Sequence, residues 1–534
     1  MVDVLVVGAG PTGLTLAAQL ASFGTAVRVV DSEPDQVHES RALAVQPRSL
    51  EVLAGLGVAD DLVGRGNPAV RLQLHAGRRT VEMPLFERGL ADTAFPFLLF
   101  VSQADTEAVL NEQVRHAGVA VERGVELVDL RRTPGGVTCT LRDCDGQRQA
   151  VHTSYVVGCD GAHSTVRTRA GIGFRGAAYP ETFVLADLHV DGLDEGAAHA
   201  YVAERGMLFF FPLGHPAPWR MLAMRPNPEA PPRGEVPSLA ELREVADGHT
   251  AGTVRLRDPV WRSYFRLQHR HAAAYRAGRV FLAGDAAHVH SPAGAQGMNT
   301  GIQDAWNLGW KLAMVTNGTA RSGLLDTYQA ERQPVGRSVV RFTDRAFTIA
   351  TSANPLVRRA RVHLAPRLLR LAARGRRART AGLRTLAQLN VAYRASPAST
   401  EGVPRLRHGP RAGDRLPEAP VTIDGRPGTL HHALTPTRLH LLLIGPDRAW
   451  PAGATGPLDG HAGIVDIHRL SRRPEPGAIH DVDGSAHRRL GATRAGQVSH
   501  WLIRPDGHIA YRAAGTNLRG LQDYLGRWLA RPSP

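Results

Sequence analysis

Three glycines and one carboxylate near the start of the chain have the types and spacing of a dinucleotide site. Residues 8–13 read Gly-Ala-Gly-Pro-Thr-Gly and follow the apolar residues 3–7, which suit a buried parallel strand. Such glycines allow a tight turn, close approach of a pyrophosphate and close packing of the next helix, whose N-terminus favours phosphate. Asp31, eighteen residues after Gly13, can accept hydrogen bonds from both ribose hydroxyls and repels a 2′-phosphate. The pattern predicts a site for FAD or NAD rather than NADP.

Two later segments repeat the pairing of an acid with a glycine. Cys159-Asp160-Gly161 follows Val156-Val157-Gly158, and Gly284-Asp285 ends a predicted strand over residues 278–285. Asp285 would lie at a carboxyl end of the sheet, where open α/β folds bind ligands, and could hold a chain of hydroxyls. Alone, Asp160 would be a turn residue and Asp285 a helix N-cap. The order of all three segments favours a cofactor site.

A loop of small residues, 292–300, precedes a predicted amphipathic helix over 299–316. Glycine-rich loops at helix N-termini present N–H groups to anions. If a flavin lies here, that anion is the N1–C2=O2 region of its reduced ring.

Together the three segments resemble the single-component (group A) FAD-dependent monooxygenases, the class that includes p-hydroxybenzoate hydroxylase, over about residues 1–400. The resemblance implies that Asp160 and Gly161 serve both FAD and NADPH, that Arg41 lies along the FAD and that Gln103 reaches the ribityl region. It also implies the reaction. NADPH or NADH reduces FAD, O₂ adds at flavin C4a, and the hydroperoxide gives one oxygen atom to an aromatic substrate.

The predicted site combines the motifs with this resemblance. Arg41 and Pro292 are the predicted catalytic residues. The predicted cofactor-binding residues are Gly8, Gly10, Pro11, Thr12, Gly13, Asp31, Ser32, Arg41, Gln103, Asp160, Gly161, Gly284, Asp285, Pro292, Gly294, Gly297, Met298 and Asn299. No metal site is predicted, because the three cysteines lack zinc spacing. His163 and His288 are interpreted as packing or surface residues.

Composition narrows the remaining function classes. The formal charge is +15, but Lys311 is the only lysine and no nucleic-acid motif accompanies the arginines, so nucleic-acid binding is not expected. No apolar run is long enough for a membrane span, and the chain enters a strand without a signal peptide. We expect a cytoplasmic protein with reduced thiols, no integral membrane association and a possible homodimer.

The predicted fold class is α/β. A Rossmann-like FAD-binding domain comprises residues 1–175 and 278–400, and a β-sheet substrate domain, residues 176–275, is interleaved between them. Residues 405–534 form a separate domain that resembles the thioredoxin-like tail of the aromatic polyketide hydroxylase branch. No cysteine follows Cys159, which excludes a dithiol role for this tail. Its deletion is expected to leave a soluble but less stable protein that still binds some flavin.

Strands are predicted over residues 183–190, 207–213 and 219–224 of the substrate domain. In the tail we predict a buried strand over 439–445, a hairpin over 501–512 and a closing helix over 521–529.

The predicted substrate is an aromatic polyketide or a related polycyclic phenol. A Baeyer–Villiger or rifamycin-type monooxygenase of the same family remains open. So do a flavin halogenase using Lys311, a non-catalytic FAD-binding assembly protein, and a quinone hydroxylase held at a membrane by the arginine-rich residues 355–385.

Overall fold

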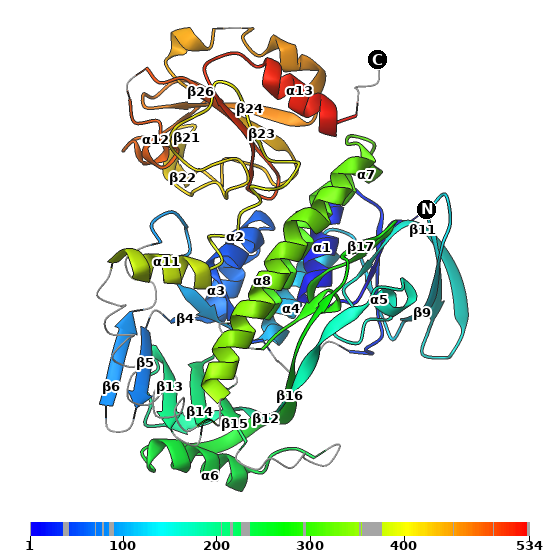
Figure 1. Ribbon diagram of the computed structural model, residues 1–534, viewed down its shortest axis with the longest axis vertical. Coiled ribbons are helices and arrows are strands. Elements are labelled where there is room, and N and C mark those ends of the chain that lie inside the picture. Colours follow the sequence, from blue (N-terminus) through cyan, green and yellow to red (C-terminus); the bar gives the residue numbers. More distant parts are fainter. Residues whose placement is uncertain are drawn as a thin grey trace.

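In the described part of the chain, three eight-stranded sheets and one three-stranded sheet form a mixed α/β fold (Figure 1). The computed structural model describes residues 2–35, 42–69, 71–76, 79–84, 90–203, 206–213, 217–225, 235–291, 295–351, 354, 376–451, 453–494 and 496–530.

The first sheet brings the three sequence motifs to one edge. Its core strands β18, β11, β1 and β2 are neighbours in that order and all run parallel. Their carboxyl ends therefore meet on the same side, and each motif follows one of these ends. The strands of this sheet are β1 (Val2–Val7), β2 (Val27–Asp31), β8 (Val121–Arg123), β9 (Glu126–Arg132), β10 (Val137–Arg142), β11 (Arg148–Gly158), β17 (Arg276–Ala277) and β18 (Val280–Leu282).

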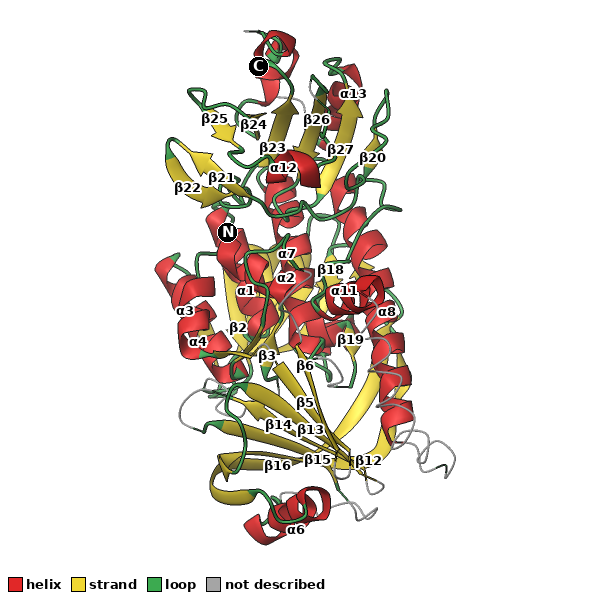
Figure 2. Ribbon diagram, turned by 90° about the vertical axis from the view of Figure 1, so that its left-hand side faces the viewer, coloured by secondary structure: helices red, strands yellow, loops and turns green. Residues whose placement is uncertain are grey.

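The second sheet has one face covered by α6 (Leu239–Thr250), as Figure 2 shows, and the other face toward the first sheet. All three strands predicted in this region are confirmed. The sheet consists of β5 (Arg71–Ala76), β6 (Arg79–Pro84), β12 (Phe174–Asp191), β13 (Ala197–Ala203), β14 (Gly206–Pro212), β15 (Trp219–Met224), β16 (Arg255–Ala272) and β19 (His288–Val289).

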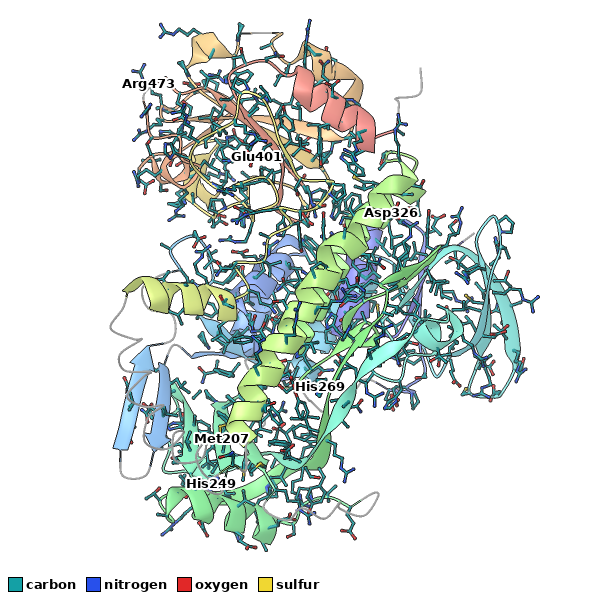
Figure 3. The ribbon with its side chains drawn as sticks, in the orientation of Figure 1. Met207, His249, His269, Asp326, Glu401 and Arg473 are labelled. Atoms are coloured by element: carbon teal, nitrogen blue, oxygen red, sulfur yellow. The ribbon has the colours of Figure 1, made fainter. Side chains whose placement is uncertain are left out.

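Two long helices join the parts. Helix α8 (Asp326–Thr351) runs from Asp326, below the C-terminal sheet, to the second sheet near Met207 (Figure 3). Helix α7 (Gly297–Thr316) was predicted to be amphipathic, but its residues 299–314 are all buried. One side of α7 packs on α1 (Pro11–Ser22), and Trp310 and Met314 enter the core of the C-terminal sheet. Neither side of α7 faces solvent, which explains the difference.

The C-terminal sheet confirms the predicted buried strand, hairpin and closing helix α13 (Arg519–Trp528). Its strands are β20 (Thr400–Glu401), β21 (Pro420–Ile423), β22 (Arg426–Thr429), β23 (Leu439–Ile444), β24 (Val465–Ser471), β25 (Ala478–His480), β26 (Ser499–Ile503) and β27 (Ile509–Ala514).

The other elements are short. The three-stranded sheet comprises β3 (Ala44–Val45), β4 (Asn67–Ala69) and β7 (Leu98–Phe100). The other helices are α2 (Pro47–Gly55), α3 (Ala59–Arg65), α4 (Gln103–His116), α5 (Thr165–Arg169), α11 (Arg376–Leu386), α12 (Ser485–Arg489) and the 3₁₀ turns η1 (Gly284–Ala286), η2 (Ser322–Leu325), η3 (Asp447–Ala449) and η4 (Gly456–His461). Most of the arginine-rich segment proposed for a membrane surface, residues 355–375, lies outside the described residues. None of the described helices is both long and apolar enough to cross a membrane.

Candidate cofactor and active site

The three glycines in the turn between β1 and α1 have different roles. Gly8 has φ +102°, and a Cβ there would overlap the carbonyl of Cys159, while a Cβ at Gly13 would overlap the carbonyl of Gly8. A Cβ at Gly10 would meet only Glu107 Oε1, at 3.9 Å. The fold therefore requires Gly8 and Gly13, whereas Gly10 borders open space. Pro11 is buried at the first turn of α1, and no side chain caps this helix, so its N-terminus suits a diphosphate such as that of FAD.

Asp31 lies at the end of β2, beside this turn. Its Oδ2 accepts a hydrogen bond from Ala9 N at 2.6 Å, and its Oδ1 accepts one from Glu33 N at 2.9 Å. Arg123 Nη1 is 3.6 Å from Oδ2, and Ser32 is exposed. Two backbone N–H groups thus orient the carboxylate at the carboxyl end of β2, where it is predicted to bind the ribose.

Glu107 is a buried acid that none of the predicted motifs includes. It lies one helical turn after Gln103 on α4, and Gln103 Nε2 donates to its Oε1 at 2.8 Å. Its Oε2 is buried without a partner among the described residues. Burial raises the pKa of Glu107, and nearby Asp31 adds to this, although the Gln103 hydrogen bond and Arg123 oppose it. The spacing of four from Gln103 was the signal that could have revealed it.

Gln103 also ties α4 to the segment that follows Arg41. Its Oε1 accepts a hydrogen bond from Ala42 N at 3.2 Å. Arg41 itself lies outside the described residues, as do Pro292 and Gly294. The predicted roles of these three residues stay predictions.

Asp160 orders the loop after β11. Its Oδ1 accepts from Ser164 Oγ at 2.5 Å and its Oδ2 from Val166 N at 3.0 Å, so it holds the start of α5. Burial raises the pKa of Asp160, and these hydrogen bonds oppose the rise. Gly161 has φ +74°, which a glycine adopts without strain.

Arg167, on α5, connects the second motif to the third. Its Nη2 donates to Ala162 O at 2.8 Å and its Nη1 to Ala286 O at 2.9 Å. The guanidinium also lies 3.8 Å from the ring centre of Phe174. One arginine thus holds the loops after β11 and β18 together.

Asp285 is exposed on η1, at the carboxyl end of β18. The preceding Gly284 has φ +62°, and a Cβ there would come within 2.5 Å of Thr12 Oγ1. Thr12 therefore packs where the first and third motifs meet. This places Asp285 and the N-terminus of α1 on the same edge of the first sheet.

A buried polar network around Asp304 on α7, which no sequence motif marks, supports η1. Asp304 Oδ2 accepts from Gly284 N at 3.1 Å and contacts His288 Nε2 at 2.7 Å, while Arg332 Nε donates to Oδ1 at 2.6 Å. Burial raises the pKa of Asp304, but Arg332 and His288 outweigh it and lower the value. His288 is therefore more than a packing residue, because it fixes this acid. His163 is exposed.

Asn299 uses its side chain to shape the loop before α7. Its Oδ1 accepts from Gln46 N, and its Nδ2 donates to the carbonyls of Ala44 and Ala295, each at 2.8 Å. These bonds join the loop to β3. Gly297 and Met298, at the N-terminus of α7, are half-buried. Asn299 is thus a positioning residue for the loop through its side chain.

An aromatic surface faces the cofactor part from the second sheet. Along β14, Leu208 and Phe210 pack with α6, whereas Phe209 and Phe211 point to the opposite face and are stacked 5.7 Å apart. Phe211 also stacks on Phe100 at 5.5 Å and belongs to a cluster that includes residues 43, 44 and 295. This surface therefore reaches the loop before α7.

Arg220 anchors the same face of the sheet. It is fully buried and binds Asp187 through two hydrogen bonds of 2.6 Å. Its Nη1 donates to Ala42 O at 3.0 Å. The pair connects the second sheet to the residue that follows Arg41.

Lys311, the candidate halogenase lysine, has another role. It is fully buried, and its Nζ donates to Glu331 Oε2 and to Asn307 Oδ1 at 2.7 Å each. Burial lowers the pKa of Lys311 to about 8. The side chain is committed to an internal ion pair, which removes the residue on which the halogenase hypothesis depended.

Comparisons with known proteins agree with this geometry. A family described as FAD binding domain matches residues 1–343, and one described as aromatic-ring hydroxylase, C-terminal, matches residues 409–532. The chain is 37% identical over 522 residues to the 6-methylpretetramide 4-monooxygenase of Streptomyces rimosus, which covers 95% of this chain and 90% of that protein.

Two solved structures have the same overall fold. The anhydrotetracycline hydroxylase from Streptomyces rimosus superposes with a TM-score of 0.79 at 29% identity and covers 99% of both chains. A ternary complex of aklavinone-11 hydroxylase with FAD and aklavinone has a TM-score of 0.75 at 27% identity and covers 98% of both chains. The chain therefore belongs to the FAD-dependent aromatic-ring hydroxylases, which are NAD(P)H-consuming monooxygenases.

Proposed function

We propose that this monooxygenase hydroxylates an aromatic polyketide or a related polycyclic phenol. The observation that carries the proposal is the half-buried aromatic pair Phe209 and Phe211, backed by the buried Phe100, beside the loop before α7. Flat fused rings stack favourably on such side chains. The relatives named for tetracycline-type and aklavinone substrates support the same class.

In this proposal the chain's own residues bind and orient FAD. The N-terminus of α1, with Gly8, Gly10, Pro11, Thr12 and Gly13, holds the diphosphate. Asp31 with Ser32, Gln103 and Asp285 bind hydroxyls, Asp160 and Gly161 order the loop between FAD and NAD(P)H, and residues 292–299 face the ring. FAD supplies hydride acceptance from NAD(P)H and activation of O₂.

Arg41 and Pro292 are the proposed catalytic residues. Residues next to both of them in the chain contact the second sheet. Ala42 accepts a hydrogen bond from Arg220, and Ala295 packs in the same apolar cluster as Phe211. Their side chains would position the ring and exclude water from the reacting atoms.

The proposed domain division has residues 1–175 and 278–400 in a Rossmann-like FAD-binding domain and residues 176–275 in the substrate domain. The parallel core of the first sheet supports the former and the α6-covered second sheet the latter. The second sheet also takes β5, β6 and β19 from the two FAD-binding ranges. Residues 405–534 form the thioredoxin-like domain, for which the parallel β23–β24 pair, the β26–β27 hairpin and α13 are the support.

We also propose a cytoplasmic location, which suits the three free thiols, and a homodimer. The test of the homodimer is the molar mass of the holoenzyme in solution.

Oxygen incorporation tests the proposed reaction. NADPH and NADH oxidation, peroxide and product are measured under ¹⁸O₂ with polycyclic phenols, simple phenols and rifamycin-type ansamycins. A polycyclic phenol should accelerate NAD(P)H oxidation and acquire one ¹⁸O as a hydroxyl. A ring-expanded ester would instead assign Baeyer–Villiger chemistry. Turnover confined to simple phenols or ansamycins would refute the substrate class.

A further inference from the structure

Two histidines and an aspartate gather on one face of the C-terminal sheet, far from the FAD motifs in sequence. Strands β23 and β24 pair in parallel, with His440 opposite Asp466 and Leu442 opposite His468. Side chains two residues apart share a face. The apolar continuation of this face, Leu442 and Leu470, belongs to a buried cluster. The three polar residues therefore stand where that core ends, in the domain drawn at the top of Figure 1.

Hydrogen bonding fixes the tautomer of His440. Its Nε2 lies 2.7 Å from the carbonyl oxygen of Thr435, which can only accept, so Nε2 carries the proton. The lone pair of Nδ1 then points to His468 Nε2 at 3.0 Å, and Asp466 Oδ2 is 3.9 Å away. A backbone carbonyl that orients an imidazole in this way is the usual support of a metal-binding histidine.

The three ligand atoms have the separation that one small divalent ion requires. They all lie within 4.8 Å of one another. Zinc–ligand bonds of about 2.0–2.2 Å in a tetrahedron place ligand atoms about 3.3 Å apart. Small rotations of the half-exposed Asp466 and His468 side chains would reach this geometry and leave one position for water.

We propose that His440, Asp466 and His468 form a zinc site in the C-terminal domain. Two imidazoles and one carboxylate suit Zn²⁺ and disfavour Mg²⁺ and Ca²⁺, which take oxygen ligands. With its proton on Nε2, His440 presents the Nδ1 lone pair toward the other two ligands. The bound ion would cross-link β23 to β24.

Arg438 opposes a metal ion at this site through its charge. Its Nη1 lies 2.7 Å from Asp466 Oδ1, and both side chains are partly exposed, at 42% and 30%. The guanidinium adds a positive charge beside the site and engages the oxygen that does not face His440. Removal of Arg438 should therefore strengthen zinc binding. If the two histidines only formed a structural hydrogen bond, removal of Arg438 would have no such effect.

The test is a calorimetric titration of tag-free, chelator-treated holoenzyme with ZnCl₂ at pH 7.5 in a buffer that does not bind metal. We expect one ion per chain and no saturable heat with MgCl₂. H468Q and D466N should each weaken binding at least tenfold, since losing a ligand costs at least as much as losing its support. H432Q, which removes an exposed histidine of the same domain, should bind like the wild type.

R438Q should bind zinc more tightly than the wild type. Flavin absorbance and the unfolding temperature of each metal-free variant verify that it has folded, and misfolding of one ligand variant leaves the other and R438Q to decide. The absence of a saturable site, a site that H468Q and D466N retain, or unchanged affinity in R438Q would overturn the assignment.

Discussion

At the scale of single residues, an added methyl group has opposite consequences at Gly10 and Gly13. At Gly10 it would enter open space beside Glu107, whereas at Gly13 it would overlap the Gly8 carbonyl oxygen. Close backbone approach to a pyrophosphate is therefore the reason for Gly10, and close packing of the α1 turn is the reason for Gly13.

The pair predicts a clean separation of folding from cofactor binding. G10A and G10V should keep most of the unfolding temperature of the apoprotein yet lose FAD, valine more than alanine. G13A should lower both. FAD absorbance of the purified protein and thermal unfolding of the apoprotein are the measurements. Full FAD content in G10V would contradict the placement of the diphosphate.

Replacing Glu107 with glutamine should stabilise the apoprotein by an amount that depends on pH. Its folded pKa is raised, so the protonated form stabilises the fold and this contribution disappears as pH rises through the folded pKa. E107Q keeps an oxygen for Gln103 and removes the buried charge. The apoprotein of E107Q should be more stable than the wild type at pH 8, and this difference in stability should shrink as the pH falls to 4.5. Urea unfolding at both pH values measures this, and an equal difference at both would contradict it.

At the scale of elements, Asn299 at the start of α7 and Asp285 on η1 differ in what their side chains do. The former shapes the fold of the loop, and the latter is predicted to bind FAD. Asn299 satisfies two buried backbone groups and a partly buried one, while Asp285 is exposed at the edge of the first sheet. N299A should therefore lower apoprotein stability by about 1–3 kcal/mol, the cost of unsatisfied buried groups, and weaken FAD binding as well. D285N should weaken FAD binding about tenfold with little change in stability. Equal loss of stability in both variants would refute this distinction.

Local patterns were sufficient to predict most elements and the edge where the motifs meet. A parallel strand, its glycine turn and the next helix are adjacent in sequence, so Gly8 to Asp31 could be read directly. Asp304 could not be recognised, because its partners Gly284 and Arg332 are 20 and 28 residues away and no motif marks them. The role of Asn299 was hidden similarly, since Gln46 lies 253 residues away. The burial of α7 depends on the C-terminal sheet, which its own periodicity cannot reveal.

At the scale of the whole molecule, buried charges join the tail to the FAD-binding part. Arg504 of the tail donates to both oxygens of Glu331 on α8, at 2.7 and 2.8 Å, and to Asp506. Lys311 on α7 binds the same Glu331. Burial alone would raise the pKa of Glu331 and Asp506, but Arg504 lowers both.

Removing Arg504 should leave these two carboxylates buried without their main counter-ion. We expect R504M to be about 3–5 kcal/mol less stable at pH 7, whereas R394A, which breaks an exposed pair with Asp414, should cost under about 1 kcal/mol. Since the lowered pKa values of Glu331 and Asp506 stabilise the fold above their ordinary values of 4.5 and 3.8, the wild type should lose this contribution progressively as pH falls from these values toward the folded ones. The difference in free energy of unfolding between the wild type and R504M should then become smaller. Equilibrium unfolding from pH 7 to pH 2.5 measures both effects.

Deletion of residues 405–534 tests whether the tail is separable. The sequence suggested a soluble remnant, but the packing predicts the opposite. Trp310, Met314 and Leu324 lie in the core cluster of the C-terminal sheet and would become exposed, and Glu331 would lose Arg504. Exposed apolar surface of this kind promotes aggregation. The truncated chain should be insoluble or lack cooperative unfolding, while the full chain unfolds in one transition. A soluble remnant with wild-type FAD content and unfolding temperature would show that the two parts fold independently. The buried pair of Arg504 and Glu331 would then only hold the two folded parts together.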